Sequence, residues 1–339
     1  MVELSSTRIG CCDQMNPDDI GVVVIGRNEG DRLIGCLRSV KSVSHRIVYV
    51  DSGSTDGSIM AAERIGARVV KLDLTRPFTA ARARNEGFAA LRTFSPNSRF
   101  VQFIDGDCIL VSGWLDQAHE FLERRRDIAI VCGRRRELHP TASVYNQLCD
   151  IEWDTPIGET TSCGGDALVR MEAFEAVGGF RAQLIAGEEP ELCVRLRKNG
   201  WNIWRLDADM TRHDAAMTRM GQFWTRAVRC GYAYAEVSRL HKASPYGIWR
   251  REATRAVVWG GFLPIIICLG ALIHPAAIGV ALAYVLQVCR IAFAREPSSS
   301  QSWIYALFIT VAKFAEFQGI LKFYWRQFSR QNVTLIEYK

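Results

Sequence analysis

Two aspartates separated by one glycine, Asp105-Gly106-Asp107, stand directly after an apolar run. The run, residues 99–104, is rich in β-prone side chains and predicts a strand buried in a sheet. Two carboxylates at the end of an interior strand are costly to bury unless a cation lies there. Carboxylate oxygens on a short turn suit Mg²⁺ or Mn²⁺, which often share their coordination shell with substrate phosphates. The alternative is an ordinary turn, because Asp and Gly are common turn residues.

Other polar residues follow the ends of other predicted strands. The apolar run 21–25 predicts a buried parallel strand and is followed by Arg27 and Asn28, and the strand predicted at 46–50 is followed by Asp51. Helical patterns separate these strands, which indicates a parallel sheet with right-handed crossovers. Ligands of such sheets bind beyond the carboxyl ends of the strands. We therefore expect these side chains and the two aspartates to share one site.

A pair of acids opens a later helix. Glu188 and Glu189 precede Pro190, which suits the first turn of a helix that continues to Lys198. An acid at this place faces the positive end of the helix dipole, so Glu189 can have a purely structural use. A strand predicted at 202–206 follows.

Composition narrows the class of protein. The 339 residues allow one large α/β domain and an appendage, and the net charge of +6 comes without any nucleic-acid recognition motif. Anionic lipid headgroups and phosphate ligands are better partners for this modest basic excess. The eleven cysteines have an odd count and no metal-ligand spacing, which indicates a reducing compartment. Residues 1–19 lack the apolar region of a signal peptide and are interpreted as a lead-in.

The C-terminal third is apolar enough to enter a membrane. Residues 256–273 and 276–289 carry no charge and flank a break at His274-Pro275, so a membrane hairpin is favoured over buried core helices. Arginines stand on both sides of the pair, which places both of its ends in the cytoplasm. A third apolar stretch, 303–323, contains three charged residues and fits an interfacial or re-entrant helix better than a span.

The expected division of the chain has four parts: a lead-in at 1–19, a catalytic domain at 20–245, a membrane hairpin at 246–295, and an interfacial helix with a basic tail at 296–339.

Taken together, these stretches resemble the family 2 glycosyltransferases, which are GT-A-fold enzymes that use nucleotide sugars. The resemblance covers roughly residues 21–214. Its motifs are, in order, VVVIGRNE, VDSGSTDGS, ARARNEG, FIDGDC, GGDALVRMEAFEAVGGF and GEEPELCVRLRKNGW. It implies an α/β fold with a Rossmann-like, mixed but mostly parallel sheet.

The resemblance also implies roles for individual residues. Asp51 would read the uracil edge, Asp105 the ribose or phosphate side, and Arg84 of the ARARN motif would support the nucleotide. Asp107 would hold Mn²⁺ or Mg²⁺ between the two phosphates. His213 stands where several relatives place a metal or phosphate ligand.

Glu189 occupies the place of the family's catalytic base, the second acid of a Glu-Asp pair, and Glu188 remains the alternative. One base without an evident second nucleophile favours a single displacement with inversion, in which a metal ion supports the leaving diphosphate. The family's usual Pro-x-Tyr-Asn is Ile25-Gly26-Arg27-Asn28 here, so Arg27 replaces the stacking tyrosine. The QxxRW motif of processive synthases is absent around residues 223–229, which favours transfer of one sugar per encounter.

The expected function is transfer of a sugar from a nucleotide sugar, a UDP-sugar by expectation, to a lipid-linked or saccharide acceptor at the cytoplasmic face of the cell membrane. Such a reaction would serve polysaccharide or glycolipid synthesis. Two alternatives remain open: a non-catalytic nucleotide-sugar-binding scaffold of a polysaccharide assembly, and a nucleotidyltransferase. The latter ranks last because no Gly-rich, Lys- or Arg-bearing first loop for a triphosphate is present.

Overall fold

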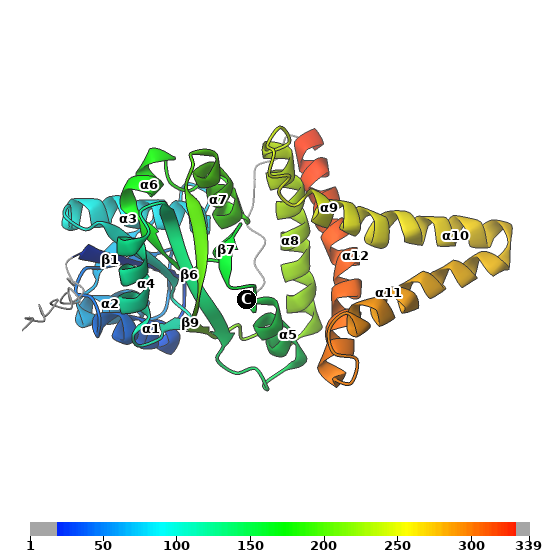
Figure 1. The fold of residues 1–339 in the computed structure, drawn as a ribbon, viewed down its shortest axis with the longest axis horizontal. Coiled ribbons are helices and arrows are strands. Elements are labelled where there is room, and N and C mark those ends of the chain that lie inside the picture. The colour runs from blue at the N-terminus through cyan, green and yellow to red at the C-terminus, as the bar shows by residue number, and fades with distance from the viewer. Residues whose placement is uncertain (1–18, 330–339) are drawn as a thin grey trace, which may run out of the picture.

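A computed structural model describes residues 19–329 of the chain. The predictions for residues 1–18 and for the basic tail 330–339 lie outside this part. Within it, nine strands form one mixed sheet that helices cover on both faces (Figure 1). The strands are β1 (Ile20–Gly26), β2 (Ile47–Asp51), β3 (Arg68–Lys71), β4 (Phe100–Asp105), β5 (Cys108–Leu110), β6 (Ile128–Glu137), β7 (Gly158–Thr160), β8 (Ala167–Arg170) and β9 (Asn202–His213).

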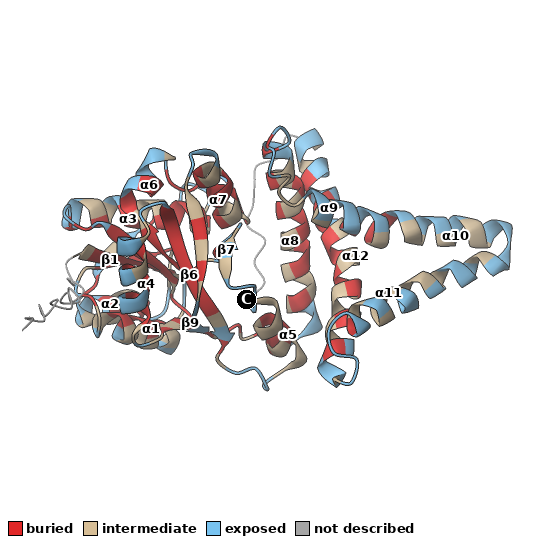
Figure 2. Ribbon diagram, viewed as in Figure 1, coloured by how far each residue is buried: buried red, intermediate tan, exposed pale blue. Residues whose placement is uncertain are grey.

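The helices of the sheet domain are α1 (Asp31–Lys41), α2 (Ser58–Ile65), α3 (Ala80–Phe94), α4 (Trp114–Arg124), α5 (Val144–Glu152), α6 (Met171–Ala176) and α7 (Glu188–Lys198). They alternate with the strands up to β4, as the sequence predicts. Buried apolar side chains of the strands and of the helices on both faces make one core (Figure 2).

The strand order β3-β2-β1-β4-β8-β6-β9-β5 confirms the predicted mixed, mostly parallel sheet. Strands β1 to β4 are mutually parallel, β8 is antiparallel to both of its neighbours, and β6 and β9 are again parallel. The register sets Asp105 beside Ile25 and Asp51 beside Gly26. The carboxyl ends of β1, β2 and β4 therefore meet at one edge, where a ligand site was expected.

Two strands continue beyond their apolar residues. Strand β9 was predicted to end at Leu206 but continues to His213, and β6 continues through the basic run 134–136 to Glu137. The two extensions pair with each other across two register shifts, so ladder hydrogen bonds hold polar residues that show no apolar alternation. Arg134 to Arg136 thus belong to the sheet.

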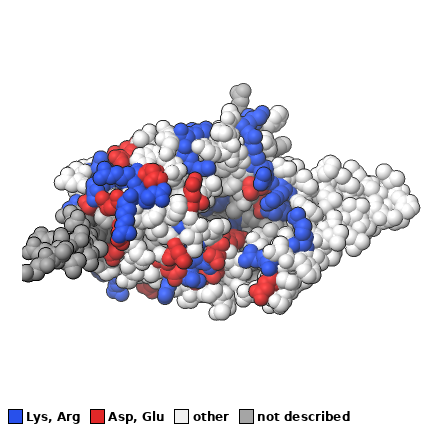
Figure 3. All heavy atoms as spheres, in the orientation of Figure 1, with Lys and Arg blue, Asp and Glu red and all other residues white. Residues whose placement is uncertain are grey.

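The C-terminal helices are α8 (Met220–Leu240), α9 (Arg250–Val257), α10 (Leu263–Ile273), α11 (Leu282–Phe293) and α12 (Ser300–Ser329). Helices α8 and α12 lie side by side between the sheet domain and a projecting hairpin (Figure 1). The hairpin turns at His274, as predicted, and its outer part carries no charged side chain (Figure 3).

Three helical segments in the described part are long and apolar enough to cross a membrane: Arg250–Ile273, Pro275–Phe293 and Ser300–Ser329. The first two correspond to the predicted hairpin. The third is one continuous helix, and length and composition alone would allow it to span as well. Within it, Lys313 Nζ and Glu316 Oε2 form an ion pair of 2.7 Å.

Glycines bring α8 and α12 into close contact. A Cβ atom at Gly231 would lie 1.9 Å from the carbonyl oxygen of Glu316, and one at Gly319 would lie 2.0 Å from that of Val228. Backbone atoms cannot turn aside as a flexible side chain can. This interface therefore requires small residues.

We expect Gly231→Ala to destabilise the α8–α12 pair by about 1–3 kcal/mol, because the added methyl forces the helices apart. Gly221→Ala is the matched control, since no atom lies within 4 Å of its added Cβ. Thermal unfolding of the purified full chain in detergent measures both changes. Equal melting temperatures for the two variants would contradict the close contact.

Candidate active site

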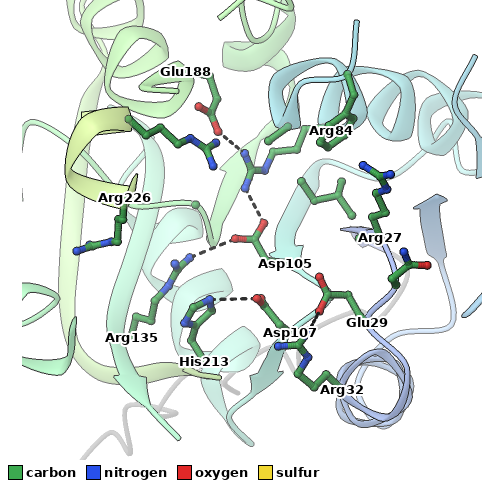
Figure 4. Close-up of a pocket in the computed structure, with 18 of the residues that line it drawn as sticks. Arg27, Glu29, Arg32, Arg84, Asp105, Asp107, Arg135, Glu188, His213 and Arg226 are labelled. Carbon is green, nitrogen blue, oxygen red and sulfur yellow. Dashed lines mark hydrogen bonds and ion pairs between the residues drawn. The ribbon is translucent and has the colours of Figure 1, made fainter. Parts of the chain in front are cut away.

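A cavity of about 610 Å³ lies at the carboxyl ends of β1 and β4 and reaches across to α8 (Figure 4). Charged side chains gather around a hollow on this face of the molecule (Figure 3). The cavity is lined by Ile25, Gly26, Arg27, Asn28, Glu29, Arg32, Phe78, Ala80, Arg84, Asp105, Gly106, Asp107, Arg135, Trp153, Gly165, Glu188, His213, Arg226 and Arg229.

Most of the residues predicted for the site line this cavity, although they come from distant parts of the chain. Asp51 and Glu189 are not among the lining residues. Those that are comprise Arg27, Asn28, Arg84, Asp105, Asp107, Glu188 and His213.

Arg84 joins two carboxylates across the cavity. Its Nη2 atom lies 2.7 Å from Asp105 Oδ1, and its Nη1 atom lies 2.7 Å from Glu188 Oε1. Helix α3 presents Arg84 from a well-capped first turn, in which Thr79 Oγ1 accepts a hydrogen bond from the Arg82 backbone at 3.0 Å. Burial alone would lower the pKa of Arg84, but the charges of Asp105 and Glu188 raise it above its usual value. Arg84 is therefore a fixed cation that orients both acids.

Asp105 is held from its other side by residues that the sequence analysis did not select. The buried carboxylate of Asp166 accepts a hydrogen bond from the Asp105 backbone at 3.0 Å and pairs with Arg135 Nη2 at 2.9 Å. The Nη2 atom of Arg135 also lies 3.9 Å from Asp105 Oδ2. The signal for Arg135 in the sequence is its place in a run of three arginines, residues 134–136.

Gly165 gives these charges room. A Cβ atom at this position would lie 3.0 Å from Arg84 Nη2 and 3.1 Å from Asp105 Oδ2. A larger residue at this position in the loop between β7 and β8 would crowd these charged groups.

Asp107 and His213 meet because β5 pairs with β9. The register sets Cys108 opposite His213, and the Nε2 atom of His213 lies 3.3 Å from Asp107 Oδ2. Burial lowers the pKa of His213 to about 4, so its ring is neutral at physiological pH. Among the described residues, its buried Nδ1 atom has no hydrogen-bond partner. A neutral imidazole beside a buried carboxylate is a donor set that suits a divalent ion.

Asp51 does not line the cavity but holds the loop that follows β2. Its side chain is 2% exposed and accepts hydrogen bonds from Tyr49 Oη at 3.0 Å and from the backbones of Gly53 and Ser54, both at 2.9 Å. The adjacent loop is tied by Asn28 Oδ1, which accepts a hydrogen bond from the backbone of Thr55 at 2.7 Å. The contact of Asp51 with the uracil of the nucleotide stays a prediction.

Glu188 and Glu189 point in opposite directions at the start of α7. Glu188 reaches into the cavity and pairs with Arg84, whereas Glu189 turns into the protein interior. There it accepts hydrogen bonds from the Cys163 backbone and, at 3.2 Å, from Cys193 Sγ. Burial raises the pKa of Glu189 above its usual value. Sequence left the choice between these two acids open, and only Glu188 lines the cavity.

Helix α8 supplies two further arginines that were not predicted for the site. Arg226 Nη1 pairs with Glu152 Oε2 at 2.8 Å, and Arg229 Nη2 donates to the Ile185 carbonyl at 3.0 Å. Both line the cavity, and Figure 4 shows Arg226 beside Arg135. Trp153 packs edge-on against His213, with ring centres 4.9 Å apart.

The model of the family described as "Glycosyl transferase family 2" matches residues 21–178. Residues 21–178 are thus similar to family 2 glycosyltransferases. This match confirms the resemblance that the motifs indicated. Residues 179–339, which include α7 and the C-terminal helices, lie beyond the matched range.

Two curated relatives carry related names. Over 211 residues the chain is 28% identical to the "Succinoglycan biosynthesis protein ExoA" of Rhizobium meliloti, which covers 58% of this chain and 63% of that protein. It is 26% identical over 210 residues to the "Pre-mycofactocin glycosyltransferase" of Mycobacterium tuberculosis, covering 58% of this chain and 43% of that protein. The chain thus spans less than two thirds of either relative.

A solved structure confirms the fold class. The mannosyltransferase PcManGT from Pyrobaculum calidifontis, described in complex with GDP-Man and Mn²⁺, superposes with a TM-score of 0.64 at 17% sequence identity. The alignment covers 91% of this chain and 88% of that chain. It therefore extends beyond the sheet domain into the C-terminal helices.

Proposed function

We propose that this protein is an inverting, metal-dependent glycosyltransferase that moves a sugar from a nucleotide sugar to a lipid-linked or saccharide acceptor. The observation that carries the proposal is one cavity in which Arg84 joins Asp105 to Glu188 beside the Asp107–His213 pair. The family of residues 21–178 and the names of the relatives support sugar transfer in polysaccharide or glycolipid synthesis.

Asp107 and His213 would hold Mn²⁺ or Mg²⁺ at the base of the cavity. Such an ion offsets the charge that develops on a leaving diphosphate. Arg84 and Arg135 fix Asp105 beside this place, so that its carboxylate is oriented before a donor enters. We assign Arg27, Asn28 and Asp105 to the donor side, with uridine diphosphate as the expected nucleotide and Asp51 as a support of the loop.

Glu188 is the better candidate for the base that takes the proton of the acceptor hydroxyl. A base must lie within hydrogen-bond reach of the proton that it removes. Glu188 faces the cavity and is oriented by Arg84, whereas Glu189 is turned away behind it. With one such base and no second nucleophile assigned, a single displacement inverts the configuration of the sugar.

The acceptor would enter from the side of α8. This helix presents Arg226 and Arg229 to the cavity and packs on its other side against α12. In Figure 1 the hairpin projects roughly across the axis of α12. If the hairpin crosses the membrane, α12 lies along the membrane surface and the cavity stands near the headgroups. Two arginines at such a place suit an acceptor that carries a lipid phosphate.

Arginines at both ends of the hairpin support a catalytic domain on the cytoplasmic side of the membrane. Arg250→Cys and Glu296→Cys, made in a Cys268→Ser background, are therefore expected to react with a membrane-impermeant thiol reagent only from the cytoplasmic side. Leu272→Cys at the hairpin tip is the matched control and should react only from the outside. The reverse pattern would contradict the cytoplasmic site.

The function itself is tested with membranes that contain the full chain. Incubation with UDP-sugars should release UDP in the presence of Mn²⁺, and a chelator should stop the release. Binding of UDP-sugars without any turnover, across a panel of lipid and saccharide acceptors, would favour a non-catalytic scaffold instead.

A further inference from the structure

A second group of metal-ligand side chains lies outside the cavity, behind the first turn of α7. Cys163 stands just before β8, while Glu189 and Cys193 share one face of α7. All three residues are buried, and one ligand atom from each lies within 4.8 Å of the others. Spacing along the chain does not reveal this group, because Cys163 lies 26 residues before Glu189 and 30 residues before Cys193.

The distances between these atoms match the edges of a tetrahedral zinc site. Cys193 Sγ lies 3.9 Å from Cys163 Sγ and 3.2 Å from Glu189 Oε1. With Zn–S bonds of about 2.3 Å and Zn–O bonds of about 2.1 Å, ideal edges are about 3.8 Å and about 3.6 Å. Both observed distances are therefore within a few tenths of an ångström of ideal values.

The charge of the group is incomplete without a cation. Within residues 19–329 no cationic side chain pairs with Glu189, whose carboxylate accepts hydrogen bonds from the Cys163 backbone and from Cys193 Sγ. A cation is a favourable partner for a buried carboxyl group in this position. Two thiols beside it are soft ligands, which zinc accepts and which Mg²⁺ does not.

We propose that Cys163, Glu189 and Cys193 bind a structural Zn²⁺ ion. Binding would release the two thiol protons and the carboxyl proton of Glu189 and form two Zn–S bonds and one Zn–O bond.

Such an ion would connect two segments that line the cavity, the loop before β8 and the first turn of α7. Cys163 is two residues from Gly165, and Glu189 is next to Glu188. Gly165 and Glu188 both line the cavity. A zinc ion that joins Cys163 to α7 would therefore fix the loop and the first turn of α7 relative to each other. It also gives Glu189 a use that explains why this acid is turned away from the cavity.

The test is the metal content of the purified full chain in detergent, after dialysis against a chelator that removes weakly bound ions. About one Zn²⁺ per chain is expected, with at least about a tenfold loss in Cys163→Ser and Cys193→Ser. Cys108→Ser is the matched control, because Cys108 is also a buried thiol and belongs to the other group of possible ligands, with Asp107 and His213. This variant should keep its zinc.

Cobalt substitution adds a readout that does not depend on activity. Co²⁺ bound by thiolates gives a sulfur-to-metal charge-transfer band, which should persist in Cys108→Ser and vanish in Cys163→Ser, with circular dichroism checking that each variant is folded. Zinc-free wild-type chain that gains no such band would overturn the proposal. A disulfide between Cys163 and Cys193, or a band that is lost only in Cys108→Ser, would overturn it as well.

Discussion

Asp107→Ala should abolish Mn²⁺-dependent binding of the donor nucleotide while the chain stays folded. Asp107 is 6% exposed and ends the turn after β4, where the Gly106 backbone donates to the Ile25 carbonyl at 2.8 Å. That backbone contact does not depend on the carboxylate, so the turn should survive the change. What is lost is the charged oxygen ligand at the place where we expect the ion to meet the phosphates.

Titration calorimetry with UDP in the presence and absence of Mn²⁺ measures this effect. Asp209→Ala is the matched control, because Asp209 lies on β9 outside the cavity and pairs with Arg136. It should bind UDP as the wild type does. Unchanged Mn²⁺-dependent binding by Asp107→Ala would reject Asp107 as a ligand of the ion.

Glu188→Gln should lower kcat for sugar transfer by about 10²–10⁴-fold, which is the usual contribution of a general base. Glutamine keeps the size of the side chain and can still accept a hydrogen bond from Arg84, but it cannot take the proton of the acceptor. Donor binding should therefore be retained. Quenched-flow or steady-state assays with saturating donor separate the loss of kcat from any change in affinity.

Glu189→Gln is the comparison that decides between the two acids. Because Glu189 is turned away from the cavity, its change should act on zinc content and stability and not on the proton transfer itself. If Glu189→Gln were inactive with donor binding intact while Glu188→Gln turned over normally, the base would be Glu189, as the family position alone predicts. Activity in both variants would contradict the mechanism.

The sequence predicted the sheet and most of the site because its signals are local. Apolar runs that end in polar residues predicted β1, β2 and β4. Because parallel strands end at the same edge of a sheet, Asn28 and Asp105 were expected to lie near each other, as they do. The hairpin was equally visible, since long uncharged runs have few other uses.

What the sequence could not give depends on directions in space. The first turn of a helix sends Glu188 and Glu189 to different sides, and no spacing rule tells which of them faces the ligand. Asp166 and Arg135 act as a pair only because β6 and β8 are neighbours, which follows from the crossover order and not from either segment. The place of Arg226 in the cavity could not be predicted for the same reason, because it depends on how α8 lies against the sheet domain.

The most direct test is one lipid-labelling assay on three forms of the purified chain. Wild type, Asp107→Ala and Glu188→Gln are each incubated with radiolabelled UDP-sugar, Mn²⁺ and a membrane lipid extract, and the label in the lipid fraction is counted. We expect labelled lipid from the wild type alone, with inverted anomeric configuration in the product. Equal labelling by all three forms would show that the cavity built around Arg84 is not where sugar is transferred.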